Sequence, residues 1–230
     1  MKKTLLALAV AAALVPSLAM AEAGDIVVRV RATHIAPDES SSLGATTNAN
    51  LPGNLANTLY GSPTAELRVD SNTIPEIDFS YYITKNIAAE LILALGTRHD
   101  VSVTPGNAGV AKNLGSVNLL PPTLTAQWHF NPDQTFDPYV GAGVSYVRAM
   151  DNGLMAEAGV PIRISRNSFG PAIQAGFDYN LENRWLLNFD IKKIWFDTKV
   201  EGNFAPGVWT KIDQLDVDPW VVSVGFGKKF

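Results

Sequence analysis

The chain has 230 residues, of which 47% are hydrophobic and 17% are charged, and its formal net charge is −4. This composition excludes a disordered chain, which needs low hydrophobicity and a high net charge, and it offers no basic footprint for nucleic acid. Because the sequence contains no cysteine, disulfides, thiolate metal sites and cysteine nucleophiles are excluded as well.

The first 21 residues have the features of a secretory signal peptide. Lys2 and Lys3 supply positive charge, residues 5–15 form an apolar run, and Ala19-Met-Ala21 is a small-residue cleavage site. The apolar run is too short for a spanning helix, which disfavours the alternative of a retained anchor. We predict cleavage after Ala21 and a single domain over residues 22–230, in which no apolar run is long enough for a membrane helix.

Eight segments of this domain alternate between apolar and polar residues, and this period of two is typical of strands with two different faces. The segments cover residues 26–33, 77–83, 89–95, 123–130, 139–146, 171–179, 185–192 and 220–230.

The connections between these segments alternate between short and long. The three short ones cover residues 84–86, 131–137 and 180–184, and the four long ones cover residues 37–73, 98–118, 149–168 and 199–216. Short periplasmic turns with longer outer loops are typical of outer-membrane barrels, for which eight strands is the smallest number. We therefore predict an all-β fold, an eight-stranded antiparallel transmembrane β-barrel with short periplasmic turns, long extracellular loops and both termini in the periplasm.

Aromatic residues distinguish a membrane barrel from a soluble, lipocalin-like barrel of eight strands. On the apolar face, aromatic residues gather at both strand ends, as the two membrane interfaces require. The short-turn end has Tyr81, Trp128, Phe130, Tyr179, Trp185 and Phe230, and the long-loop end has Tyr146, Phe169, Trp195 and Trp220. The last strand also ends in Phe230, which is similar to the signal that outer-membrane proteins present to the barrel-assembly machinery.

Four stretches of the mature chain carry a resemblance to a known family. They are Asn86-Ile-Ala-Ala-Glu-Leu91, Leu120-Pro-Pro-Thr-Leu124, Pro138-Tyr-Val-Gly-Ala-Gly-Val144 and Asp218-Pro-Trp-Val221. With these stretches the whole mature chain resembles the OmpW family of small outer-membrane barrels, although the connection over residues 37–73 is longer than expected of that family.

The resemblance implies a narrow barrel that passes small hydrophobic molecules, which enter between the outer loops, cross an apolar upper lumen and leave sideways through the wall. The partners expected on this basis are membrane lipid, lipopolysaccharide and a small hydrophobic ligand. No cofactor and no nucleic acid are expected.

The polar face of the strands predicts a charged interior. Seven charged residues should point inward, and three are positive while four are negative. They are Arg29, Arg31, Lys192, Asp78, Glu90, Asp178 and Asp190. Buried charges persist when they are paired, so we predict a structural plug of ion pairs in the lower lumen, with a selectivity ring as the alternative.

Two further groups suggest a route for a ligand. Ile92, Ala94 and Val147 should point into the upper lumen and form an apolar binding pocket, because an eight-stranded interior has room for one small ligand at most. Pro121 and Pro122 interrupt the fourth segment, and proline donates no ladder hydrogen bond. They predict a lateral opening in the wall, or else a strand that merely starts at Thr123.

Catalysis and metal binding find little support in the sequence. His34, His99 and His129 lack the spacing of metal ligands, and no serine lies within two residues of His129, so neither an enzyme nor a metal site is predicted. A structural or adhesive barrel with a sealed lumen, acting through exposed and flexible loops such as residues 37–73, remains an alternative to a channel.

Overall fold

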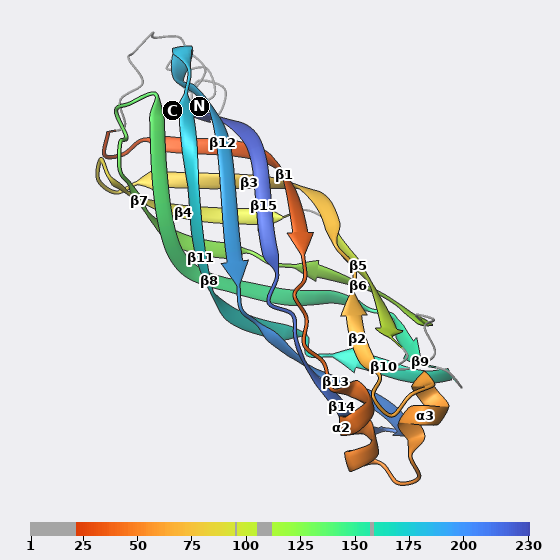
Figure 1. Cartoon of the computed structure of the whole chain (residues 1–230). Helices are drawn as coiled ribbons and strands as arrows, with labels where there is room; N and C mark the ends of the chain where they lie inside the picture. Colours follow the sequence, from red (N-terminus) through yellow and green to blue (C-terminus); the bar gives the residue numbers. More distant parts are fainter. Residues whose placement is uncertain (1–21, 95, 105–111, 157–158) are drawn as a thin grey trace, which may run out of the picture.

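The computed structural model describes residues 22–94, 96–104, 112–156 and 159–230. The predicted signal peptide (residues 1–21) and Leu95 of the third predicted segment lie outside the described residues. Within the described part, eight antiparallel strands form a closed barrel in which neighbours in sequence are neighbours in space, as predicted (Figure 1). The strands are β1 (Ile26–Ala36), β3 (Asn72–Tyr82), β4 (Ile87–Ala94), β7 (Thr123–His129), β8 (Phe136–Asn152), β11 (Asn167–Asn180), β12 (Trp185–Ile194) and β15 (Trp220–Lys229).

The two faces of the wall differ in polarity in the way that a membrane barrel requires. Leu91 and Val224 are 39% and 53% exposed on the outer face, whereas Asp78 and Asp190 are completely buried inside. A soluble barrel would bury its apolar face instead, so that alternative is wrong. The outward position of the apolar residues also explains why they repeat with a period of two, because successive side chains of a strand point to opposite faces.

Aromatic side chains surround the outer face at both ends, as predicted. Those of the short-turn end are exposed, and at the other end Phe169, Trp195 and Trp220 are exposed whereas Tyr146 is half-buried. Among the described helices, including the short 3-10 helix η2 (Glu182–Arg184) in one turn, none is long and apolar enough to cross a membrane.

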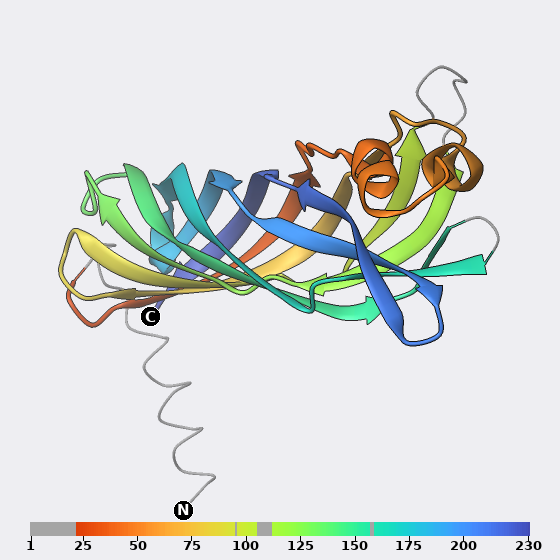
Figure 2. The same ribbon diagram turned by 90° about the horizontal axis from the view of Figure 1, so that it is seen from below.

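The long connections extend the barrel at the end opposite the C-terminus (Figure 2). Strands β6, β5 and β2 continue the barrel sheet beyond β8, and a second sheet has the order β14-β13-β10-β9. The bounds are β2 (Glu66–Val69), β5 (Thr97–Thr104), β6 (Lys112–Leu120), β9 (Leu154–Ala156), β10 (Val160–Ile164), β13 (Asp197–Ala205) and β14 (Val208–Asp216), with helices α2 (Leu43–Asn50) and α3 (Leu55–Tyr60) beside them.

These elements share one hydrophobic core outside the membrane. Leu43 and Tyr60 from the helices are fully buried together with Val103 and Ile212 from the two sheets. The expectation that residues 37–73 form an exposed, flexible loop is therefore wrong. Its apolar residues pack against strands that are distant in sequence, and a local pattern does not reveal such partners.

Glycines on β15 leave room for arginine side chains inside the narrow barrel. Gly225 lies opposite Arg31 and Gly227 lies opposite Arg29 in the β1–β15 pairing. A Cβ atom on Gly225 would lie 2.8 Å from Cγ of Arg31, and one on Gly227 would lie 2.7 Å from Cγ of Arg29. Interiors this tightly packed do not absorb extra atoms without strain.

We predict that Gly225→Ala lowers the free energy of unfolding by about 1–3 kcal/mol, because the added methyl group overpacks the interior. Urea unfolding in detergent measures the change. Gly153→Ala is the matched control, since the nearest atom to its Cβ would be the carbonyl oxygen of Ser116 at 3.9 Å. Equal unfolding midpoints for the two variants would contradict the packing argument.

Candidate ligand site and the lumen beneath it

Arg29 anchors a network of buried charges across the middle of the lumen. Its Nη2 and Nε atoms lie 2.5 and 3.2 Å from the two carboxylate oxygens of Asp178, which is the two-point geometry of a strong arginine–carboxylate pair. Its Nη1 atom donates to Ser80 at 2.6 Å and lies 3.4 Å from Glu90. All of these side chains are buried, so the arginine is fixed from several strands at once.

Arg31 forms a second centre one layer further out. Its Nε atom lies 2.9 Å from Glu76 and is also paired with Asp78, and its Nη1 atom donates to Asn188 at 3.0 Å. Glu90 links the two arginines, because its Oε1 atom lies 3.4 Å from both.

Two glutamines, a tyrosine and a lysine also take part in this network. Gln127 and Gln174 donate to the other oxygen of Glu90 at 2.8 and 2.9 Å. On the opposite side of the lumen, Lys192 lies 2.7 Å from Asp190, which also accepts a hydrogen bond from Tyr139. Apart from Lys192 and Asp190, which share β12, the ion pairs of this network join different strands.

All seven charged residues that the sequence placed in the lumen lie in this network, and we call it the charge plug. Glu76 belongs to it as well and was missed, because the predicted strand began at residue 77 whereas β3 begins at Asn72. Continuing the period of two backward from Asp78 would have found it. With Glu76 the plug has three cations and five carboxylates.

A second hydrogen-bonded group lies between the plug and the periplasmic end. His129 contacts Asp137 at 2.7 Å through Nδ1 and lies within 3.3 Å of the Tyr82 hydroxyl. Leu186, also buried here, packs with Val27. This layer and the charge plug both lie across the direct path along the barrel axis.

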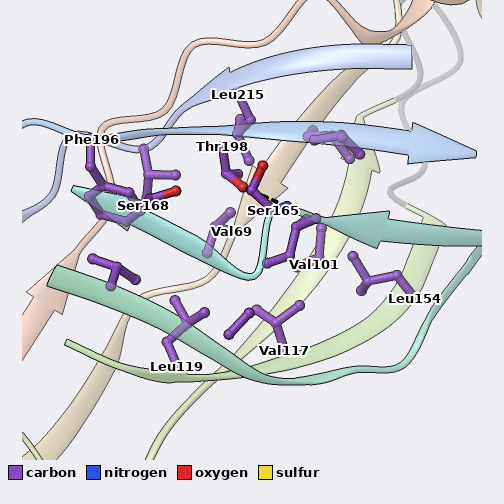
Figure 3. A pocket seen from close by; sticks show the side chains of 16 residues that line it. Val69, Val101, Val117, Leu119, Leu154, Ser165, Ser168, Phe196, Thr198 and Leu215 are labelled. Atoms are coloured by element: carbon purple, nitrogen blue, oxygen red, sulfur yellow. Dashed lines mark hydrogen bonds between the residues drawn. The ribbon is translucent and has the colours of Figure 1, made fainter. Parts of the chain in front are cut away.

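Two apolar hollows lie on the other side of the plug, toward the extracellular end. The outer hollow lies among β2, β5, β6, β8, β9 and β13 and contains about 550 Å³ of space between atoms, its open mouth included. Figure 3 shows Phe196 and Ser168 at one end of it and Leu154 at the other. Hydroxyl groups of Ser165, Ser168 and Thr198 are its few polar side-chain atoms.

The inner hollow lies nearer the barrel and is lined by residues from the barrel strands and the connections between them. It contains about 480 Å³, measured in the same way, and Ile35, Ile194 and Val221 form part of its wall. The two hollows share Val69, Leu119, Val147, Phe196 and Val217. They are therefore adjacent compartments of one apolar space.

Of the three predicted pocket residues, one lines the hollows and two do not. Val147 lines both hollows. Ile92 and Ala94 are buried on the inner face of β4, yet neither lines either hollow. Pro121 lines the inner hollow, and together with Pro122 it separates β6 from β7.

On the β4 side, the described residues, which do not include Leu95, show no regular pairing beside these prolines. The β4–β7 pairing ends at Ile92 opposite Thr123, and the β5–β6 pairing begins only at Thr97 opposite Leu119. On the other side the wall stays joined, since the amide of Tyr146 donates to the carbonyl oxygen of Pro122 at 2.9 Å. We call the interval between the two paired regions the seam.

Most residues that line the hollows were missed because they lie in the long connections. One signal was present in the sequence. Thr97, His99, Val101 and Val103 are buried at every second position of β5, so the period of two extended into a segment that was interpreted as a loop. No comparable signal marks Phe196, whose partners come from distant elements.

The chemistry of the two hollows suits a small, mainly apolar molecule. Apolar walls with a few polar groups are typical of small-molecule sites, where the polar groups set the orientation of the ligand. The lumen below is charged and closely packed, so the same ligand would find no comparable surroundings there.

Comparison with known proteins places the chain in a family. The family model of the OmpW family matches residues 22–230. Outer membrane protein W of Vibrio cholerae is 32% identical over 236 residues, covering all of both chains. Outer membrane protein W of Escherichia coli K12 is 33% identical over 234 residues, covering all of this chain and 99% of its own.

Solved structures agree with these sequence matches. The crystal structure of the outer membrane protein OprG from Pseudomonas aeruginosa has a TM-score of 0.76 at 32% identity, covering 93% of this chain and 99% of its own. The structure of outer membrane protein AlkL in lipid bilayers has a TM-score of 0.63 at 26% identity, covering 91% of each chain. The chain is therefore a member of the OmpW family, an eight-stranded β-barrel of the outer membrane.

Proposed function

We propose that this protein takes up small hydrophobic molecules passively from outside the cell. A molecule enters the outer hollow, moves into the inner hollow and leaves sideways through the seam into the membrane. The observation that carries this proposal is the apolar space formed by the two adjoining hollows, which ends at a lumen filled with charge.

The charge plug makes a straight path along the barrel unfavourable. An apolar molecule that crossed it would separate Arg29 and Arg31 from their carboxylate partners, and leaving one member of a buried pair alone costs about 3–5 kcal/mol. The group around His129 and Asp137 would then have to open as well. Lateral exit requires neither step.

The seam supports lateral exit because its strands are less firmly joined there. Pro121 and Pro122 have no amide hydrogen to donate, and the pairing between β4 and β7 has already ended. Pro121 also lines the inner hollow, so the weakened part of the wall adjoins the apolar space. The membrane outside the seam is itself an apolar solvent for the cargo.

The name of one relative supports this class of cargo. A protein of Pseudomonas aeruginosa that is 24% identical over 161 residues is named for a dibenzothiophene metabolism operon. Dibenzothiophene is a small apolar aromatic molecule of the kind that the hollows would accept.

The same proposal includes contacts with the surrounding membrane. The exposed aromatic residues of the extracellular end, such as Phe169 and Trp220, would contact lipid and lipopolysaccharide at the outer surface. Phe230 directly follows β15 and is 52% exposed, which would suit recognition by the barrel-assembly machinery.

A sealed barrel that acts through its extracellular part is the second candidate. The hydrophobic core that joins the long connections favours it, because a folded surface of this kind would suit adhesion without any transport. The two candidates differ in whether the protein raises the rate at which apolar molecules cross a membrane.

We predict that Val147→Asp reduces uptake of an apolar fluorescent dye into vesicles at least tenfold, because it places a carboxylate in the wall of both hollows. Wild-type protein should raise uptake well above that of empty vesicles. Met155→Asp is the matched control, since Met155 is exposed on β9 and lines neither hollow. Wild-type uptake equal to that of empty vesicles would favour the sealed barrel.

We also predict that closing the seam stops exit. In Ala94→Cys/Pro121→Cys the two cysteines face each other if the β4–β7 register continues by two residues, and the natural chain has no cysteine to interfere. Dye uptake should fall on oxidation and recover on reduction. The control pair His34→Cys/Thr73→Cys joins a regularly paired part of the wall. Unchanged uptake after complete cross-linking at the seam would rule out this exit.

A further inference from the structure

His99 is a buried polar side chain that the transport route does not by itself explain. It lies on β5, is only 3% exposed, and lines the inner hollow. Its Nδ1 atom lies 2.9 Å from the carbonyl oxygen of Asp70. Because a carbonyl oxygen accepts and does not donate, Nδ1 must carry the proton of this bond.

This hydrogen bond fixes the character of the other ring nitrogen. When Nδ1 carries the proton of a neutral imidazole, Nε2 presents a lone pair and acts as an acceptor. The ring is also held from the side, since a carboxylate oxygen of Asp70 lies 3.7 Å from Nδ1 and is itself bonded to the amide of Asp100 at 2.6 Å. The tautomer and the orientation of the ring are thus both set by the protein.

The Nε2 atom has no hydrogen-bond partner among the described residues. The other two polar side chains that line the inner hollow are bonded within the protein, because Thr97 donates to the carbonyl oxygen of Leu119 and Ser145 accepts from Thr123 at 2.9 Å. The remaining lining side chains are apolar. A ligand that fills the hollow would cover this acceptor, and a covered acceptor without a partner is unfavourable, so a ligand that donates a hydrogen bond would be favoured over one that does not.

We propose that the inner hollow selects apolar molecules that carry a single hydrogen-bond donor, such as long-chain alcohols or phenols, and that Nε2 of His99 accepts that hydrogen bond. This inference rests on the proposed function and narrows its substrate class. It separates alcohols and phenols from hydrocarbons and ethers of the same shape, which would fill the hollow but leave Nε2 unpaired.

The expected selectivity is about two- to tenfold. One hydrogen bond between neutral groups in a protein contributes about 0.5–1.5 kcal/mol, and each factor of ten in affinity corresponds to about 1.4 kcal/mol. The ligand keeps its other contacts with apolar walls, so hydrophobic burial still supplies most of its affinity.

A pair of fluorescent probes tests the proposal directly. 2-Naphthol donates a hydrogen bond, and 2-methoxynaphthalene has nearly the same shape without a donor. Binding of each is measured with full-length mature protein in lipid nanodiscs, after subtraction of the signal from empty nanodiscs. Wild-type protein should bind 2-naphthol about two- to tenfold more tightly, and His99→Leu should bind both probes alike. His34→Leu, on the exposed outer face of β1, should keep the wild-type preference.

The possible results separate the two proposals. Binding of both probes with equal affinity by wild-type protein would overturn the role of His99 and leave the proposed uptake intact, and this comparison needs no variant to fold. Failure of both probes to bind above empty nanodiscs would overturn the proposed function together with this inference. A preference for 2-naphthol that survives in correctly folded His99→Leu would assign the selectivity to another group.

Discussion

The structure depends on the requirement that every polar group of the membrane-spanning part be satisfied inside a narrow closed barrel. Lipid accepts no hydrogen bonds, so the sheet must close on itself. Charged side chains must then point inward and be paired, as Arg29 and Arg31 are with the carboxylates of three other strands, β3, β4 and β11. Glycines at the facing positions of β15 leave room for the arginine stems.

This constraint places the apolar space toward the extracellular end of the barrel and beyond it. An eight-stranded interior is only wide enough to be filled by side chains or to hold one small ligand, and here the charge plug and the layer around His129 occupy it. Apolar space is found where the barrel strands continue toward the extracellular end and the long connections fold over them. Strand β5 contributes to the hydrophobic core of this extracellular part and, through His99, to the wall of the inner hollow.

The membrane-spanning part could be predicted well from the sequence because the pattern of each strand is set by whether its own side chains face lipid or the lumen. Each outward residue faces lipid and each inward residue faces the polar lumen, so a period of two directly gives strand number, face and connection order. Glu76 was missed because the predicted strand began at residue 77, after it, whereas β3 begins at Asn72; the rule itself holds at Glu76. The same rule identifies Asp78, Glu90 and Asp190 as inward residues.

The extracellular part was harder to predict because its contacts are not local. Leu43 and Ile212 are far apart in sequence and are buried in the same core, and nothing near either residue in the sequence indicates the other. Ile92 and Ala94 were correctly predicted to lie on the inner face of β4. Whether an inward residue lines empty space depends, however, on how much of the interior the neighbouring side chains fill, and these side chains come from several strands.

The central claim is that an apolar molecule occupies the hollows and leaves before it reaches the plug. The most direct measurement is solid-state NMR of the protein in lipid bilayers with a labelled apolar aromatic molecule, recording which side chains contact it. We expect contacts with Val147, Phe196 and Pro121. Contacts with Leu186 or Tyr82 at the periplasmic end would show passage straight through the barrel and would contradict lateral exit.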